Sequence, residues 1–279
     1  MKLRYLFLIS LLILTASFSA LFLLPKTPAP VKVLSQSVDV IPQQPQFQPI
    51  YGTIIRHGLP VIKALTLTLD ADAGTANKKS SQLREFLYQP KIIETLESEN
   101  IPATIFVTGL WAKNHSEVLK NLSRNRLFEI GNHSYSHPAF SKACTNLFLV
   151  DEADRVRQFK ESQQTITDII GWEPKLFRFP GGCHLPKDLE TAKSFGLTVV
   201  HWDTDAQDAF GKTKDQLVAS IKKQIHPGAI ILLHLNGGES DSDVAGALPE
   251  IISYAKENGY IFIKAGEMLS QMEAAPSTN

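Results

Sequence analysis

From Val61 onward, short apolar segments rich in β-branched residues alternate with longer amphipathic segments. The predicted strands are residues 62–69, 103–107, 127–130, 175–179, 197–202, 229–234 and 260–264. The predicted helices are residues 81–99, 112–124, 151–170, 188–195, 213–225 and 243–258. Strands that alternate with helices of this length pair in parallel through right-handed crossovers. The sequence therefore predicts an α/β barrel with seven strands rather than eight, with a doubly wound open sheet as the alternative.

Unusual polar residues cluster directly after the predicted strands. Asp70 and Asp72 follow the first strand, and His133 and His137 follow the third. Further along the chain, Arg178, Asp208 and His234 lie at or just after three more strands. Catalytic groups of α/β barrels lie at the carboxyl ends of the strands. We therefore expect one rim of the barrel to hold carboxylates, imidazoles and a guanidinium group.

The segment Gly131–Pro138 places two histidines four positions apart, directly after an apolar run. This spacing predicts that His133 and His137 face the same way on one helical turn, where both could bind a single metal ion. Two surface histidines near a helix start would show the same spacing, so the pair alone does not establish a metal site.

The N-terminus has the pattern of a membrane anchor. Lys2 and Arg4 precede an uncharged run from Tyr5 to Leu24, whose 20 residues would span about 30 Å as a helix. We expect an uncleaved anchor in residues 1–25, a Pro/Gln-rich linker in residues 26–50 and the folded domain in residues 51–279. The domain would then lie outside the cytoplasm, anchored to the membrane, or be secreted if the anchor is cleaved.

Charge and cysteine content narrow the partners further. Lys and Arg total 28, as do Asp and Glu, and this neutral balance argues against nucleic acid as a partner. The two cysteines, Cys144 and Cys183, each follow a candidate site motif by a few residues. On the exported side of a membrane they could form a disulfide or remain two buried thiols. No pattern predicts an oligomeric state.

Five motifs, in order, resemble those of the polysaccharide deacetylases, carbohydrate esterase family 4, also called the NodB-homology family. The first reads Thr-Leu-Asp-Ala-Asp-Ala-Gly at residues 68–74, and the second, His-Ser-Tyr-Ser-His at residues 133–137, matches fully. The others are Arg-Phe-Pro-Gly at 178–181, Asp-Ala-Gln-Asp-Ala at 205–209 and Leu-Leu-His at 232–234. The resemblance covers residues 61–268 and implies a distorted (β/α)7 barrel.

The resemblance also implies a divalent metal ion, zinc in the first place, with cobalt, nickel or manganese as alternatives. Carried over by position, Asp72, His133 and His137 would be its ligands. Asp70 would be the general base, paired with Arg178. The reaction implied is hydrolysis of N-acetyl groups on an envelope or extracellular glycan, which releases acetate.

By the same resemblance, the backbone N–H of Gly181 would stabilise the oxyanion. His234 would be the general acid that protonates the leaving amine, and Asp208 would orient it.

This sequence departs from the family pattern at four positions, one of which is Leu235, which follows His234 where an aspartate is common. Ala71 separates the two aspartates, which are adjacent in the common motif, so the roles of Asp70 and Asp72 could be exchanged. Gly181 replaces an aromatic residue and Ala209 replaces a tryptophan, which predicts a more open sugar-facing wall. Two alternatives therefore remain open: an O-acetyl esterase or cyclic-amide hydrolase with the same metal site, and a catalytically silent glycan-binding envelope protein.

Overall fold

The computed structural model describes residues 47–73, 88–235 and 242–275. These residues fall within one unit, Val40–Asn279. The predicted membrane anchor, most of the predicted linker and the start of the first predicted helix lie outside the described residues. Within the part that is described, no helix is both long and apolar enough to cross a bilayer.

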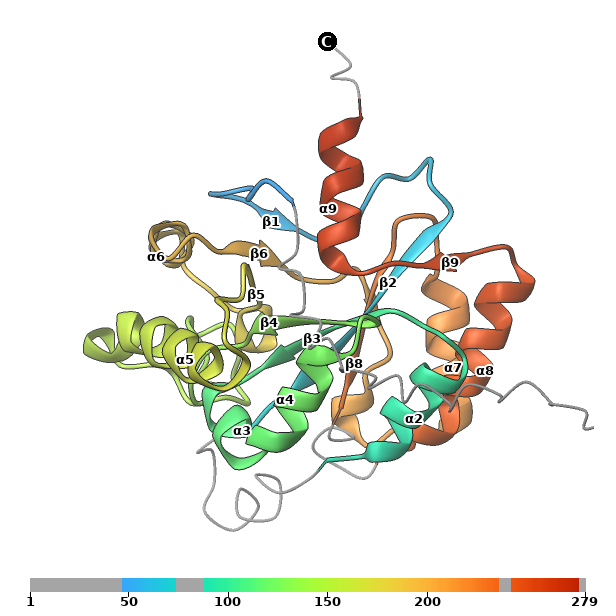
Figure 1. Cartoon of the computed structure of the whole chain (residues 1–279), viewed down its shortest axis with the longest axis horizontal. Helices are drawn as coiled ribbons and strands as arrows, with labels where there is room; N and C mark the ends of the chain where they lie inside the picture. Colours follow the sequence, from blue (N-terminus) through green and yellow to red (C-terminus); the bar gives the residue numbers. More distant parts are fainter. Residues whose placement is uncertain (1–46, 74–87, 236–241, 276–279) are drawn as a thin grey trace, which may run out of the picture. The chain divides into compact units, whose positions relative to one another are not determined.

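Among the described residues, nine strands form one parallel sheet at the centre of the domain (Figure 1). They are β1 (Ile54–Ile55), β2 (Ala64–Ala71), β3 (Ala103–Val107), β4 (Phe128–Asn132), β5 (Leu176–Phe177), β6 (Thr198–Val200), β7 (Thr204–Asp205), β8 (Ile230–His234) and β9 (Ile261–Phe262). Their order is β1-β6-β5-β4-β3-β2-β8-β7, and β9 pairs with the start of β2. The prediction of a parallel, distorted (β/α)7-type fold is confirmed. The strands β1 and β7 were not predicted, because two residues are too few for a periodic pattern.

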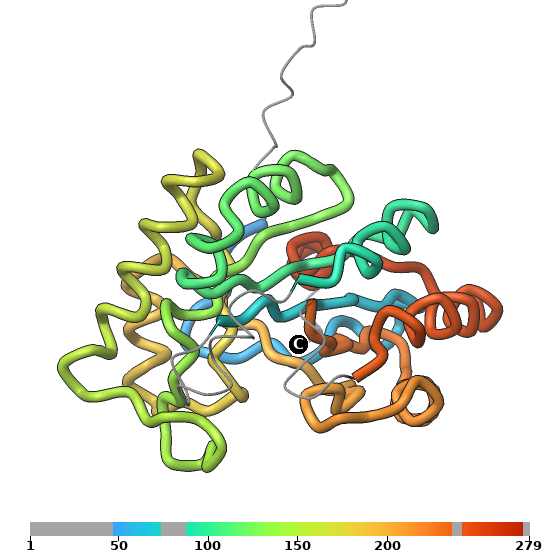
Figure 2. Tube along the Cα trace, turned by 90° about the horizontal axis from the view of Figure 1, so that it is seen from below, coloured from blue at the N-terminus to red at the C-terminus, as the bar shows by residue number. Residues whose placement is uncertain are grey.

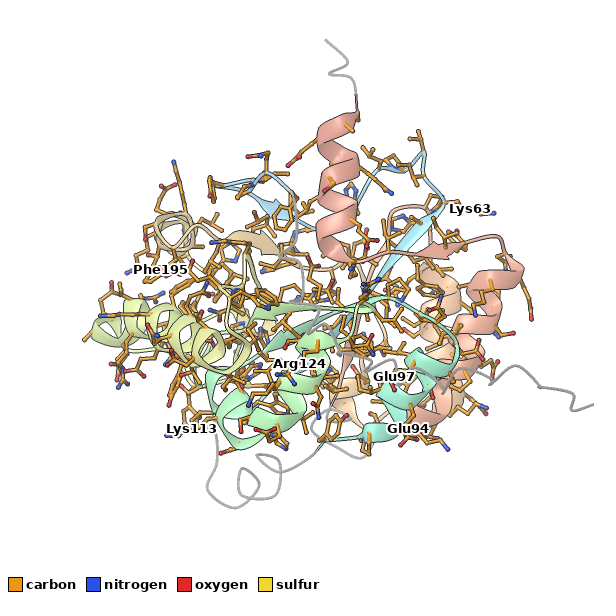
Figure 3. The ribbon with its side chains drawn as sticks, viewed as in Figure 1. Lys63, Glu94, Glu97, Lys113, Arg124 and Phe195 are labelled. Carbon is orange, nitrogen blue, oxygen red and sulfur yellow. A yellow bond between two sulfur atoms is a disulfide. The ribbon has the colours of Figure 1, made fainter. Side chains whose placement is uncertain are left out.

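Eight α-helices cover the described sheet: α2 (Pro90–Ser98), α3 (Gly109–Asn114), α4 (Ser116–Arg124), α5 (Arg155–Ile170), α6 (Pro186–Ser194), α7 (Lys214–Gln224), α8 (Val244–Glu257) and α9 (Ala265–Ala274). Short 3₁₀ turns are η1 (Glu152–Asp154), η2 (Pro180–Gly182) and η3 (Asp208–Phe210). Helices α5 and α6 lie on one flank of the strands, and α7 and α8 lie on the opposite flank (Figure 2). Helices α2, α3 and α4 carry charged side chains on their outer faces, among them the labelled Glu94, Glu97, Lys113 and Arg124 (Figure 3).

Two helical predictions differ from the structure. The helix predicted at 112–124 is two helices, separated at His115, whose φ of −122° and ψ of 39° are not helical. Helix α9 was not predicted, since its start depends on distant partners. The backbone N–H of Gly266 donates to buried Glu129 at 2.9 Å. By contrast, the start of α7 has a local capping pair, in which Thr213 and Gln216 exchange side-chain to backbone hydrogen bonds.

Strand β2 shows how the sequence positions the site. Leu67 and Leu69 belong to the main apolar cluster shared with the covering helices. Alternate residues of a strand point to opposite faces, so Thr68 and Asp70 face the interior of the barrel. Both are buried, with 0% and 3% exposure. An acidic side chain is thereby placed inside the fold at the carboxyl end of the central strand.

Candidate active site at the carboxyl ends of the strands

Asp70 and Arg178 form a buried ion pair at this edge of the sheet. Arg178 Nη1 lies 2.8 Å from Asp70 Oδ1 and also donates to Thr68 Oγ1 at 2.9 Å. Its other donors reach the carbonyls of Val200 and His201, both at 3.1 Å. The guanidinium is fully buried, and burial lowers the pKa of Arg178 while Asp70 opposes that shift. These fixed contacts hold the Asp70 carboxylate in one orientation.

His133 lies on the other side of the same carboxylate. Its Nε2 is 3.3 Å from Asp70 Oδ2, and its Nδ1 is 2.8 Å from the carbonyl oxygen of Arg178. A carbonyl only accepts hydrogen bonds, so Nδ1 carries the proton and Nε2 presents a lone pair. Burial lowers the pKa of His133 to about 4, which outweighs the opposing effect of Asp70. The imidazole is therefore neutral at pH 7, and Nε2 has no hydrogen-bond partner.

The prediction that His133 and His137 share a helical turn is wrong, although the two rings do meet. Ser134 and His137 have left-handed φ values of 68° and 58°, and the segment is a loop. Side-chain acceptors hold this shape. Gln158 Oε1 accepts from the N–H groups of Tyr135 and Ser136 at 3.0 and 2.9 Å. The ring centroids of the two histidines lie 4.9 Å apart.

Asp72 lies beside the second histidine of this pair. His137 Nε2 is 3.5 Å from Asp72 Oδ2. The inserted Ala71 is the reason that both carboxylates reach the histidines, because residues two apart in an extended chain share a face. Each carboxylate thus contacts a different imidazole: Asp70 contacts His133, and Asp72 contacts His137.

The donor set suits a divalent metal ion. Among the described residues, no three His, Cys, Asp or Glu side chains already form a closed metal-binding cluster. The contacts are two acid–imidazole pairs. However, the buried Nε2 of His133 presents a lone pair that has no hydrogen-bond partner. A cation bound at this nitrogen would satisfy it, and imidazole and carboxylate are ordinary ligands of zinc.

His234 and Asp208 form a second acid–imidazole pair, one strand away. Asp70 and His234 are direct partners in the pairing of β2 with β8. His234 Nδ1 lies 2.9 Å from Asp208 Oδ1, and the His234 N–H donates to Asp208 Oδ2 at 2.7 Å. Burial disfavours the imidazolium, but the neighbouring carboxylates, Asp208 first and then Asp72 and Asp70, together raise the pKa of His234 to about 10. His234 is therefore a held cation, with Nε2 available to donate a proton.

Gly181 lies in the turn η2, where its φ of 60° is left-handed. A disulfide joins Cys144 to Cys183, two residues beyond Gly181, with Cα atoms 5.9 Å apart. Of the two alternatives that the sequence left open for the cysteines, the structure has the disulfide.

Three contributors to the site were not predicted. Thr68 accepts from Arg178 and donates to the carbonyl of Ile231 at 2.6 Å. Its position two residues before Asp70 on an extended strand was the available signal. Gln158 shapes the histidine loop, and Ser242 donates to the Asp208 carbonyl. No local pattern identifies Gln158 or Ser242, because each is 20 or more residues from its partner.

A carboxylate held by an arginine lies beside a cationic imidazole at the carboxyl edge of a parallel sheet, where enzymes of the α/β-barrel class have their catalytic groups. A family model described as polysaccharide deacetylase matches residues 63–200. A peptidoglycan-N-acetylmuramic acid deacetylase of Bacillus subtilis is 30% identical over 190 residues, which cover 67% of this chain and 68% of that protein. The chain belongs to the polysaccharide deacetylase family, whose named relatives here are hydrolases of carbon–nitrogen bonds.

Two further relatives bear on the activity. A peptidoglycan-N-acetylglucosamine deacetylase of Bacillus cereus is 30% identical over 181 residues, which cover 65% of this chain and 63% of the relative. This chain thus matches less than two thirds of that relative's length. A crystal structure of a family 4 carbohydrate esterase pseudoenzyme from Bacillus anthracis aligns with a TM-score of 0.65 and 25% identity, over 79% of this chain and 70% of that one.

Proposed function

We propose that this protein is a metal-dependent hydrolase that removes N-acetyl groups from an envelope glycan of peptidoglycan or chitin-like type and releases acetate. One observation carries the proposal: Asp70, held by Arg178, and the cationic His234 are cross-strand partners at one sheet edge. Amide hydrolysis needs a base for the attacking water and an acid for the leaving amine. The names of the relatives point to acetylated amino sugars as the substrate class.

The side chains have distinct tasks in this reaction. Asp70 takes a proton from the attacking water, and Arg178 keeps the carboxylate ionised and oriented. The Gly181 N–H donates to the oxygen of the tetrahedral oxyanion. When the carbon–nitrogen bond breaks, His234 Nε2 gives its proton to the leaving nitrogen, and Asp208 stabilises the imidazolium until then. Asp72, His133 and His137 would hold a divalent ion, zinc first, which when bound would supply a water of lowered pKa and polarise the acetamide carbonyl.

Acetate release from a panel of glycans tests the proposal. The domain would be stripped of metal, reloaded with zinc, cobalt, nickel or manganese, and incubated with N-acetylated peptidoglycan, chitooligosaccharides and O-acetylated glycans. We expect acetate and new free amines from the N-acetylated substrates only after reloading. Acetate without free amine would instead identify an O-acetyl esterase. Opening of an added cyclic amide to the amino acid, with no acetate from the glycans, would identify a cyclic-amide hydrolase.

The catalytically silent alternative predicts no acetate from any of these substrates in any metal state. The similarity to a pseudoenzyme makes this outcome informative. Against it, this chain retains the proposed base in contact with its arginine, Asp70 with Arg178. It also retains the proposed acid, His234, in contact with Asp208.

We also propose that the domain acts outside the cytoplasm, tethered by residues 1–25. The apolar run after Lys2 and Arg4 and the disulfide support this location. Fractionation of cells that express the full chain, with protease added from outside, tests the location. A protein protected from the protease in intact spheroplasts would contradict it.

The Asp208→Asn variant is expected to shift the pH dependence of turnover. Without the carboxylate, burial dominates and the pKa of His234 falls from about 10. The alkaline limb of the pH–rate profile should therefore move to lower pH, and the NMR titration of the His234 imidazole should move with it. In the native protein, the raised pKa of His234 adds stability that is fully present below the ordinary histidine pKa of 6.5 and is lost as pH rises toward about 10. In Asp208→Asn this part of the pH dependence of unfolding should vanish.

Asp203→Asn is the matched control, since Asp203 forms a similar contact with His226 at 2.9 Å, away from the proposed acid. It should leave the alkaline limb in place. A profile unchanged in Asp208→Asn would remove His234 from the role of general acid.

A further inference from the structure

The proposed oxyanion donor, Gly181, lies in a Gly-Gly dipeptide. Gly181 and Gly182 are both left-handed, with φ values of 60° and 73°. Gly182 N–H donates to the Phe179 carbonyl at 2.9 Å, and Cys183 N–H donates to the Pro180 carbonyl at 3.3 Å. These bonds close the turn, but two successive glycines retain more backbone freedom than any other pair. Neither residue has a side chain that could anchor the turn by packing.

A second loop, residues 138–149, covers Gly181. The sulfur of Cys144 lies 2.6 Å from the place that a Cβ of residue 181 would occupy, and Leu147 Cδ1 lies 3.3 Å from it. The tip of the loop therefore rests directly on the Gly181 backbone. A larger residue at 181 would have to displace the disulfide as well as adopt a strained φ.

This loop begins at the histidine segment of the site. It leaves the site directly after His137 and closes on itself through Ala139, whose N–H donates to the Phe148 carbonyl at 2.7 Å. At its base, the buried Phe140 packs on Phe179 with ring centroids 5.2 Å apart. The base is thus fixed by packing, and the disulfide fixes the tip.

We propose that the Cys144–Cys183 disulfide is a positioning cross-link that holds the Gly181 peptide N–H where the oxyanion forms, so that breaking it slows turnover. The inference rests on the proposed function, which assigns the oxyanion contact to Gly181. An aromatic side chain at position 181 could anchor this turn by packing. This chain has glycine there, and the cross-link anchors the turn instead. Both cysteines are partly exposed, so a reductant in solution can reach the bond.

A disulfide that only stabilises the fold predicts something different. It would act mainly on the unfolded chain, so its loss would lower the melting temperature and leave kcat unchanged well below that temperature. A cross-link that positions an oxyanion donor acts on the transition state, so its loss lowers kcat more than it changes KM. The split between kcat and KM separates the two roles.

The test compares oxidised and phosphine-reduced protein, both loaded with metal, on the acetylated glycan that the panel identifies. The chain has only two cysteines, so reduction has a single target. We expect kcat to fall about 10- to 100-fold, which is no more than the fall in kcat that removal of one oxyanion donor causes. KM should change by less than about threefold. Reoxidation should restore kcat.

Variants make the comparison specific. The Cys144→Ala/Cys183→Ala double variant should have the low kcat of the reduced protein and no response to the phosphine, which controls for metal chelation by the reductant. Leu147→Ala should give an intermediate loss. Phe148→Ser, on the same loop and 55% exposed, should leave kcat unchanged.

Hydrogen exchange gives a readout that needs no activity. Backbone amides of residues 181–183 should exchange faster in the double variant than in the native protein, with and without metal, while those of β2 should not change. If the double variant does not fold, reduced native protein whose circular dichroism is intact supplies both measurements.

Equal kcat values in the oxidised and reduced proteins would overturn the proposed cross-link role, whatever the melting temperatures. Failure of the proposed function looks different, because the oxidised native protein would then release no acetate at all.

Discussion

Arg178→Met is expected to lower the free energy of unfolding by about 3–5 kcal/mol and to abolish acetate release. Arg178 is fully buried and is the cationic partner of Asp70, at 2.8 Å. Removing one member of a buried ion pair leaves an uncompensated charge in a low-dielectric interior, which accounts for the size of the loss. The carbonyls of Val200 and His201 would also lose their donor. Urea unfolding in the presence of a chelator measures the stability, so that no bound cation compensates Asp70.

Arg157→Met is the matched control. Arg157 lies on α5 with 54% side-chain exposure and pairs with Asp154 at 3.1 Å. Exposed ion pairs contribute little, so its loss should cost less than about 1 kcal/mol. Combining Arg178→Met with Asp70→Asn should recover part of the lost stability, since the buried charge is then gone. A loss no larger than that of the control would show that the buried pair does not hold the site together.

Asp70→Asn is expected to lower kcat/KM by about 10²–10⁴-fold, the usual contribution of a general base, while metal content stays near that of the native protein. Asp72→Asn should instead lose both metal and activity. The structure makes the comparison necessary, because Asp70 contacts His133 at 3.3 Å and Asp72 contacts His137 at 3.5 Å. Metal analysis after dialysis, together with acetate release, distinguishes the two aspartates.

The opposite result, with metal lost from Asp70→Asn and kept by Asp72→Asn, would exchange the two roles. That outcome would assign the base to Asp72, which is more exposed and has the longer contact with its histidine. Metal retained by both variants would remove the aspartates from the ligand set altogether.

The sequence predicted the parallel architecture, because alternating strand and helix patterns extend over most of the domain. It also predicted that Asp70, His133, Arg178 and His234 meet at one edge, since each is at or next to the carboxyl end of a strand. Short elements such as β1 and β7 were missed, and helix α9 was missed because Thr104 and Glu129 hold its start. These failures share a cause: the stabilising partners lie far away in the chain.

The amino-acid sequence alone determined that Asp70 faces the barrel interior together with Thr68, and that the extra Ala71 turns Asp72 to the same side, because the side-chain period of an extended chain is two. Only the tertiary structure decided which imidazole each carboxylate contacts. It also decided that the His133–His137 segment is a loop held by Gln158, and that Cys144 closes over Gly181. Those features depend on how separate segments approach one another, and no local pattern of residues contains that information.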